Sequence, residues 1–369
     1  MKINLSNNKF IYDRKHLTHT KNIIRTRINE ERNLVKGIRL NRNERVEGYP
    51  KGLLSKIFSK TKSYDLAKYP DQNIIYKQLS QFFNLSVENF FLTPGIDGGI
   101  KCIFEVFTKP GDKILVLQPS YAMYEIYSGV YKTKLSKVTY DPKSLRLNRR
   151  DLIAQIKKKP KILFLPNPNQ PIEDNLSLND IKKLCTLCYK NKVLLVVDEA
   201  YYMFGSVSAK NLIYKYENLI VLRTFSKSFG LPSIRLGLVI SRSKIINILK
   251  SFRLSYETNF LTDQVAIYFL KNFSFVKKYI EKVKRGREYF RKKVKNLGFD
   301  VIGKDSNFLL INFKSEELCK NIYKELLSNL IYVKGNYSAP LNTCLLLTCG
   351  PMYIMKKVYL VLKQSLSNN

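Results

Sequence analysis

Acidic residues, histidine and long hydrophobic runs are scarce in this sequence. Its 369 residues include 29 Asp and Glu against 64 Lys and Arg, and only 2 His. No stretch approaches the roughly 18 apolar residues of a membrane-spanning helix, and residues 1–9 lack the apolar core of a signal peptide. These absences predict a cytoplasmic protein without a membrane partner, and a hydrophobic content of 45% fits a globular chain with a large core.

The shortage of acidic residues leaves a formal net charge of +35. Such a charge can indicate binding to nucleic acid or to acidic membranes. Here the lysines are spread along the chain, and the densest stretch, Lys277–Lys295, has the apolar spacing of an amphipathic helix that ends near Gly298. We interpret the charge as solvated surface lysine, which argues against nucleic acid as a partner. The positive surface could also attract small anionic substrates, such as phosphorylated compounds.

Cysteine and histidine do not form a metal-binding pattern. Cys185 and Cys188 make a lone CxxC inside a predicted helix, and the two histidines, His16 and His19, lie far away in the sequence. A second pair at metal spacing is missing, so we predict buried, inert thiols and no metal site.

Short apolar runs alternate with helical patterns along the middle of the chain. Runs that are apolar at successive positions are typical of central strands covered on both faces. The pattern predicts an α/β fold: an arm at residues 1–37, a three-layer αβα large domain over 65–250, and a smaller α+β unit from 255. The predicted strands lie at 113–117, 161–165, 193–197, 219–222 and 236–240 in the large domain, and at 308–312 and 344–348 in the smaller unit.

The residues after the apolar run 219–222 carry the most specific chemistry. Lys227 is preceded by the hydroxyls of Thr224 and Ser226, and Arg235 follows eight residues later. A lysine kept neutral by burial and neighbouring positive charge can form a Schiff base with an aldehyde. Hydroxyls and an arginine fork can bind a phosphate. The combination predicts a pyridoxal-phosphate site; the alternative is a surface lysine in a loop after a strand.

A second cluster follows the run 193–197. Asp198 would bind the protonated pyridine nitrogen of such a cofactor and keep the ring an electron sink, and Tyr201 can donate to its phenolic oxygen. Tyr121, after the run 113–117, could stack on the ring, with Tyr124 as the competing aromatic assigned to the core. The alternative for Asp198 is an ordinary aspartate between a strand and a loop.

A glycine turn opens the helical segment after Pro94. The backbone N–H groups of Ile96 and Asp97 at a helix start would point toward an anion, assisted by the helix dipole. Glycine turns before helices are common, so this motif gains weight only beside Lys227. There it predicts a second contact to the cofactor phosphate.

From about Ile38 to the C-terminus the chain resembles the fold-type I pyridoxal-phosphate aminotransferases, and most of all the histidinol-phosphate aminotransferase group. The segments that carry the resemblance are Leu40-Asn-Arg-Asn-Glu, Lys68-Tyr-Pro-Asp, Pro94-Gly-Ile-Asp-Gly, Pro119-Ser-Tyr-Ala-Met-Tyr, Pro166-Asn-Pro-Asn-Gln-Pro, Asp198-Glu-Ala-Tyr, the Lys227 segment and Ser306-Asn-Phe. Their joint occurrence in this order is highly specific.

The resemblance implies a mostly parallel seven-stranded sheet and a small domain built from both chain ends, here 38–64 and 255–369. It implies that Lys227 is the catalytic lysine, which also moves a proton between substrate and cofactor. It further implies a homodimer in which Tyr69 reaches the phosphate of the neighbouring subunit. Asn307, in the Ser306-Asn-Phe segment, is expected to bind substrate.

Three positions depart from the family pattern. Gln170 stands where an asparagine before the second Pro of Asn-Pro-Asn-Asn-Pro-Thr-Gly contacts the phenolic oxygen, and Pro171-Ile-Glu follows it. Leu346 stands where an arginine usually binds the substrate carboxylate, and Lys334 where a second substrate arginine often appears. A lysine offers a point charge instead of a fork, so we expect an altered substrate: a phosphorylated compound, a phosphonate or an aldehyde. By their position in the sequence, Arg42 and Arg45 are candidates to bind the substrate carboxylate in place of the missing arginine.

The sequence thus predicts an aminotransferase that uses pyridoxal 5′-phosphate, a small-molecule amino donor and a carbonyl acceptor. Two alternatives stay open. A decarboxylase of a phosphorylated amino acid, of the threonine-phosphate type, would share the scaffold and the cofactor. A non-catalytic binding protein would explain the charge, although the retained Lys227, Asp198 and Arg235 argue for chemistry.

Overall fold

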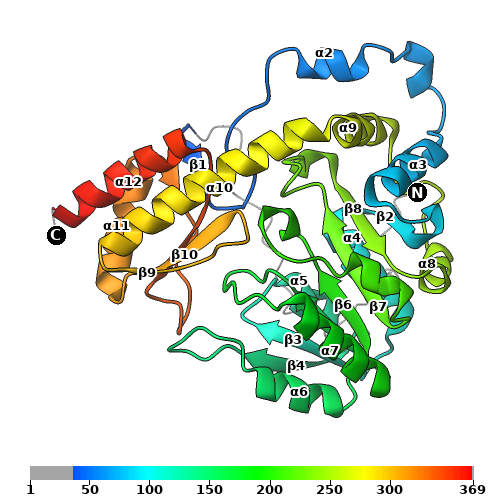
Figure 1. Ribbon diagram of the computed structural model, residues 1–369, viewed down its shortest axis with the longest axis horizontal. Helices are drawn as coiled ribbons and strands as arrows, with labels where there is room; N and C mark the ends of the chain where they lie inside the picture. Colours follow the sequence, from blue (N-terminus) through cyan, green and yellow to red (C-terminus); the bar gives the residue numbers. More distant parts are fainter. Residues whose placement is uncertain (1–35, 368–369) are drawn as a thin grey trace, which may run out of the picture.

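A twisted seven-stranded sheet forms the centre of the molecule, for which a computed structural model describes residues 36–367 (Figure 1). The strand order is β2-β8-β7-β6-β5-β3-β4, and β8 alone runs antiparallel to its neighbours. The predicted mostly parallel sheet is therefore confirmed. The strands are β2 (Phe90–Pro94), β3 (Lys113–Gln118), β4 (Lys134–Thr139), β5 (Ile162–Pro166), β6 (Leu194–Asp198), β7 (Leu219–Thr224) and β8 (Leu236–Ile240).

Helices cover both faces of this sheet and make the three layers expected from the sequence. Successive residues of a strand point to opposite faces, so Ile162 and Phe164 pack in one apolar cluster and Leu163 and Leu165 in the other. This double burial is why the strands are apolar at every position. The first cluster contains α4 (Gly95–Phe107), α5 (Met123–Val130) and α8 (Ser243–Lys250); the second contains α3 (Gln72–Phe83), α6 (Arg149–Lys157), α7 (Leu178–Lys190) and α9 (Phe260–Lys271).

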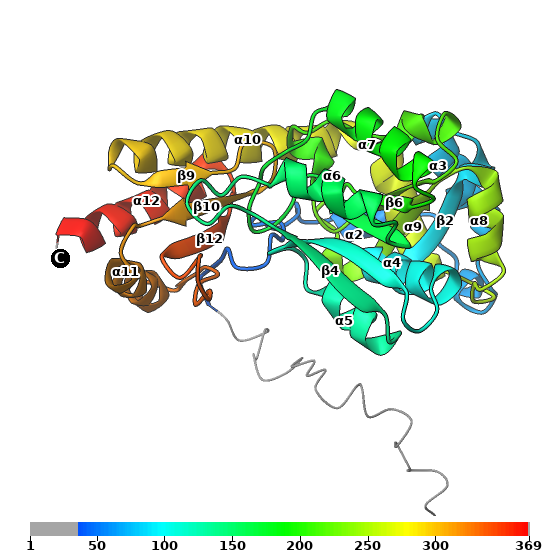
Figure 2. The ribbon, with the colours of Figure 1, turned by 90° about the horizontal axis from the view of Figure 1, so that it is seen from below.

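A smaller α+β unit lies beside the sheet and is joined to it by the long helix α10 (Phe273–Asn296), as Figures 1 and 2 show. The helix ends just before Gly298, whose φ of 89° suits glycine, as predicted. Its apolar side is buried and its lysines face outward. The unit contains the antiparallel sheet β12-β10-β9 and the parallel pair β1-β11. These strands and the two helices packed with them are β1 (Ile38–Arg39), β9 (Asp300–Ile302), β10 (Phe308–Asn312), α11 (Glu316–Ser328), β11 (Ile331–Tyr332), β12 (Cys344–Thr348) and α12 (Met352–Ser367).

Several predictions concern the ends and the thiols. Of the predicted arm 1–37 only residues 36 and 37 are described, and His16 and His19 lie outside the described residues. Cys185 and Cys188 are buried on α7, and burial raises the pKa of both thiols to about 12, which fits inert thiols. Between residues 36 and 367, no helix is long and apolar enough to cross a membrane.

Candidate active site

A cavity of about 650 Å³ opens at the carboxyl ends of β5, β6 and β7, where α/β sheets bind ligands. Residues 41–44 and 333–335 of the smaller unit close its other side. Most of the residues predicted from the sequence line it: Ile96, Asp97, Tyr121, Gln170, Asp198, Tyr201, Thr224, Ser226, Lys227, Arg235 and Lys334. Tyr69 and Asn307 do not line the cavity of their own chain.

Lys227 lies in the wall of this cavity, half-buried, beyond the end of β7. Its amino group donates to the carbonyl oxygen of Arg42 at 3.1 Å and lies 5.8 Å from the ring centre of Tyr201. Burial lowers the pKa of the amine to about 8, because the charged form loses solvation. A substantial fraction of the amine is therefore neutral near pH 8, the form that a nucleophile requires.

Asp198 ends β6 with both carboxylate oxygens facing buried donors. Tyr124 Oη donates to Oδ2 at 2.7 Å, and the backbone N–H of Ala200 donates to Oδ1 at 3.0 Å. Burial raises the pKa of Asp198 to about 6, and the two donors only partly offset this. A carboxylate that is costly to bury implies a cationic partner in the cavity. Tyr124 also stacks on Phe164 at 4.9 Å, so its predicted core role is correct, but the bond to Asp198 was not foreseen.

Tyr201 is held by the smaller unit. Its hydroxyl accepts a hydrogen bond from Asn43 Nδ2 at 3.0 Å, which leaves its own proton for another acceptor. Asn43 is buried, and its backbone N–H donates to Thr348 Oγ1 at 2.8 Å. Asn307 Nδ2 in turn donates to the carbonyl of Asn43 at 3.1 Å. Asn307 therefore supports Tyr201 through Asn43 from outside the cavity lining.

The groups predicted to bind phosphate meet at the start of α4. Arg235 adopts a left-handed conformation (φ 52°) and its carbonyl accepts from the N–H of Gly95 at 2.9 Å. Gly95 has a φ of 71°, which favours glycine, and a Cβ there would lie 2.5 Å from Arg235 Nη2 and push the guanidinium aside. The cap residue Pro94 supplies no side-chain acceptor, so the first N–H groups of the helix remain available at the cavity. Such a helix start suits an anion.

The two hydroxyls complete this anion site. Thr224 Oγ1 lies 3.0 Å from Ser226 Oγ, and it also accepts the N–H of Ser226 at 3.0 Å. Arg235 is exposed toward the cavity and lies only 3.8 Å from the carboxylate of Asp97. Asp97 is engaged elsewhere, since it accepts the hydroxyl of Tyr121 at 2.5 Å.

Two neighbouring amides occupy the loop after β5. Gln170 lines the cavity half-buried, while Asn169 is buried and fixed: it accepts from Ser120 Oγ at 2.7 Å and donates to the carbonyl of Pro119 at 3.0 Å. Because Asn169 is used to hold the loop, Gln170 is the amide left to contact a ligand.

The two positions at which the family usually has arginine, and this chain does not, lie side by side. Lys334 and Leu346 form an antiparallel bridge, with N–H to O distances of 2.8 Å in both directions. Lys334 lines the cavity, whereas Leu346 is buried in the core. Arg42 also lines the cavity. Arg45 does not: its guanidinium lies 3.7 Å over the ring of Tyr279 and pairs with Glu47.

This set of groups fits pyridoxal phosphate. One wall carries a half-buried amine, another a buried carboxylate that makes no ion pair within residues 36–367, and the uncapped start of α4 with two hydroxyls and Arg235 suits a phosphate. Among the described residues, no group of three or more His, Cys, Asp or Glu side chains could hold a metal ion.

Comparisons with known proteins agree with this geometry. Residues 2–355 match the family model described as aminotransferase class I and II. A protein of Carboxydothermus hydrogenoformans named histidinol-phosphate aminotransferase 1 is 34% identical over 300 residues, which are 80% of this chain and 84% of that protein.

Solved structures share the fold at lower identity. Histidinol-phosphate aminotransferase from Sinorhizobium meliloti, solved with pyridoxal 5′-phosphate, has a TM-score of 0.81 at 21% identity and covers 90% of this chain and 91% of that one. L-threonine-O-3-phosphate decarboxylase from Porphyromonas gingivalis has a TM-score of 0.74 at 20% identity, with 89% and 99% covered. The chain belongs to the class I and II aminotransferases, a family of pyridoxal-phosphate enzymes, as the motifs around Lys227 predicted.

Proposed function

We propose that this protein transfers an amino group between a small amino donor and a carbonyl acceptor, with pyridoxal 5′-phosphate as cofactor. The observation that carries the proposal is the meeting of Lys227, Asp198 and the anion site around Arg235 in one cavity. The bound cofactor supplies an electron sink for charge that develops at the substrate carbon.

Three residues that line the cavity have definite tasks in this proposal. Lys227, whose amine is neutral in part near pH 8, accepts the proton from the substrate carbon and returns it. Asp198 balances the cationic ring nitrogen and is itself oriented by Tyr124 and the N–H of Ala200. Tyr201, fixed by Asn43, would donate a hydrogen bond from its hydroxyl to the cofactor's phenolic oxygen.

The decisive experiment is an absorption spectrum of the purified protein with the cofactor, before and after addition of candidate donors. A band in the visible range that bleaches with a donor and returns with a carbonyl acceptor supports amino transfer. Release of CO₂ without formation of a keto product would instead favour the decarboxylase. Absence of any cofactor band would overturn the proposal.

The substrate is proposed to differ from that of the named relatives. Lys334 faces the cavity beside Leu346, and within the described part of the chain no carboxylate pairs with its ammonium group. The surrounding walls lower the pKa of Lys334 through loss of solvation, although part of the side chain is exposed. We propose that it contacts an anionic group of the substrate as a point charge. Efficient turnover of histidinol phosphate with glutamate would count against an altered substrate.

Replacing Lys334 with methionine should raise KM for the anionic substrate by roughly 10- to 100-fold, the usual worth of a charged hydrogen bond. The spectrum of the bound cofactor should not change, because Lys334 lies on the substrate side. Steady-state kinetics with the best donor found in the spectral assay would measure this. Lys324→Met, on the exposed side of α11, is the matched control, and an equal effect of both variants would contradict the assignment.

We also propose a homodimer with shared active sites. The helix α2 (Leu53–Phe58) has no buried residue and lies at the edge of the molecule next to α9 (Figure 1). Exposed apolar side chains are frequent in α2 and the residues after it, and in α9 and the residues before it: Leu54, Tyr64, Leu66, Tyr69, Phe252, Leu254, Tyr256 and Leu261. So much exposed apolar surface suits a second copy of the chain. Tyr69 stacks on Tyr256 at 4.4 Å, in this patch and away from its own cavity.

Sedimentation analysis should show a dimer, and the double variant Leu54→Glu, Leu66→Glu should shift it to monomer. Tyr69→Phe should stay dimeric and weaken cofactor binding by roughly tenfold, the worth of one hydrogen bond to a charged group. A monomeric parent protein, or unchanged affinity in Tyr69→Phe, would refute shared sites.

The cytoplasmic location and the division into domains at 65–250 and at 38–64 with 255–369 remain proposals from the sequence.

A further inference from the structure

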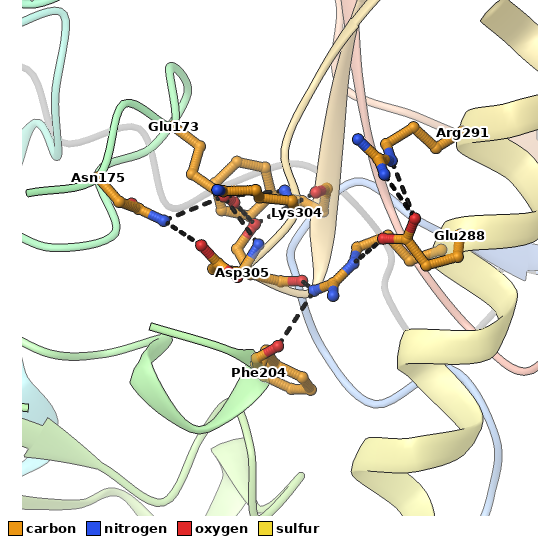
Figure 3. A network of polar contacts seen from close by, with 10 residues as sticks. Glu173, Asn175, Phe204, Glu288, Arg291, Lys304 and Asp305 are labelled. Atoms are coloured by element: carbon orange, nitrogen blue, oxygen red, sulfur yellow. Dashed lines mark hydrogen bonds and ion pairs between the residues drawn. The ribbon is translucent and has the colours of Figure 1, made fainter. Parts of the chain in front are cut away.

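A buried carboxylate joins the two parts of the molecule next to the cavity. Glu173 follows the loop of Gln170 and belongs to the sheet domain, yet three of its hydrogen-bond partners lie in the smaller unit (Figure 3). Its Oε1 accepts the backbone N–H groups of Lys304 and Asp305, both at 2.8 Å, and its Oε2 accepts the hydroxyl of Ser306 at 2.5 Å. Hydrogen bonds to an ionised acceptor are the stronger kind, so this contact holds the turn 304–306 firmly.

Further contacts hold the same turn. Asn175 donates to Asp305 Oδ2 at 2.9 Å and to Glu173 Oε1 at 3.2 Å. Arg287 of α10 donates to the carbonyls of Ser306 and Phe204, and thereby ties the turn to the end of the loop after β6. Glu173 is nevertheless the only acceptor of the two N–H groups at 304 and 305 among the bonds recorded for the described residues.

The turn leads directly to the residues that support Tyr201. Asn307 follows Ser306 and donates to the carbonyl of Asn43 at 3.1 Å, and Asn43 donates to the hydroxyl of Tyr201 at 3.0 Å. Asn43 is also held by Thr348, so a displacement of the turn would act on the Tyr201 hydroxyl through the bond from Asn307 to Asn43.

We propose that Glu173 is a positioning residue, a latch that locks the 304–306 turn onto the sheet domain and so fixes Asn43 and the hydroxyl of Tyr201. The part that concerns Tyr201 rests on the proposed function, whereas the latch itself does not. In the family pattern Asn-Pro-Asn-Asn-Pro-Thr-Gly, glycine stands where this chain has Glu173. Glycine has no side chain to make these bonds, so a chain that follows the family pattern at this position cannot form the latch.

Hydrogen exchange of the full-length protein without cofactor tests the latch. Glu173→Ala should speed exchange of the amides of Lys304 and Asp305 by roughly 10- to 100-fold, because each loses a charge-assisted bond. Glu173→Gln should stay close to the parent. Its amide oxygen can still accept both N–H groups, and its NH₂ can donate to Ser306, whose hydroxyl has the carbonyl of Phe308 at 3.2 Å as another acceptor. Glu281→Ala, an exposed carboxylate on α10, is the control.

The absorption of the bound cofactor tests the link to Tyr201. The Tyr201 hydroxyl, as a hydrogen-bond donor to the phenolic oxygen, stabilises the deprotonated form of the bound cofactor. If this donor is displaced, the pKa of the cofactor rises, so in Glu173→Ala the midpoint of the pH-dependent absorption change should be higher by roughly half a unit or more. Glu173→Gln should restore the parent midpoint. Ser306→Ala, which removes one donor to Glu173, should lie in between and serves if Glu173→Ala fails to fold.

The outcomes separate the two proposals. Unchanged exchange at 304 and 305 in Glu173→Ala overturns the latch. Faster exchange with an unchanged midpoint keeps the latch and overturns its control of Tyr201. A missing cofactor band in the parent protein overturns the proposed function, while the exchange result still decides whether the latch exists.

Discussion

Replacing Lys227 with alanine should lower amino transfer by about 10⁴-fold, the upper range for loss of a positioned proton-transfer group. Lys227 is placed for this role by its half-buried position in the cavity wall and by a bond to the carbonyl of Arg42 at 3.1 Å. The variant should still fold, because no ion pair of Lys227 is recorded in residues 36–367. Single-turnover kinetics with the donor found in the spectral assay would measure the loss.

The pH dependence of cofactor capture gives a readout that does not depend on turnover. Burial lowers the pKa of Lys227 to about 8, with Glu44 as the largest opposing charge. Only the neutral amine attacks an aldehyde, so the capture rate of the cofactor-free protein should rise with pH and level off above about 8. Because the folded pKa is depressed, the charged amine costs stability; this cost grows as the pH falls from about 10.4, the ordinary value for lysine, to about 8, and stays constant below that. An exposed lysine would level off only near pH 10.4.

Two variants make the test specific. Lys227→Arg keeps a positive charge but has no amine that deprotonates, so capture should be absent. Lys210→Ala is the matched control, since burial also lowers the pKa of Lys210, which lies outside the cavity and donates to the carbonyl of Phe83 at 2.8 Å. Capture by Lys227→Ala at the parent rate would refute the assignment.

The central strands could be predicted because burial on both faces leaves a continuous apolar run. The predicted runs lie within two residues of β3, β5, β6, β7 and β8. β4 was missed for the opposite reason. It is an edge strand, and in Lys134–Thr139 only Val138 is buried, so its sequence resembles a loop.

The site could be predicted where its residues follow strand ends in a fixed local order, as Asp198, Thr224 and Lys227 do. The supporting residues could not, because they meet their partners only through the fold. Tyr124 is 74 residues from Asp198, and Asn43 is 158 residues from Tyr201. Glu173 was visible in the sequence only as a departure from the family pattern, and nothing local connects it with Ser306, 133 residues away.

The largest effect on stability is expected at a buried ion pair beneath the site. Glu199 follows Asp198 at the end of β6, and Arg223 precedes Thr224 on β7. Arg223 Nη2 lies 2.7 Å from Glu199 Oε2, with the Nε at 3.1 Å from the same oxygen. Neither side chain is more than 3% exposed. Glu199 also accepts the N–H of Ala209 at 2.5 Å, and the guanidinium lies 3.5 Å over the ring of Tyr202.

Removing one partner of this pair leaves the other charge buried without compensation. Glu199→Leu and Arg223→Met alone should each lower the free energy of unfolding by about 3–5 kcal/mol. Replacing both, as Glu199→Leu with Arg223→Met, should cost much less than the sum, because no buried charge remains. Urea unfolding of the cofactor-free protein measures all three. Glu105→Ala, in an exposed pair with Lys101, should change stability by no more than about 0.5 kcal/mol. If the losses in the two single variants simply add in the double variant, the pair is not coupled, and the positions of Asp198 and Thr224 must be maintained by the sheet alone.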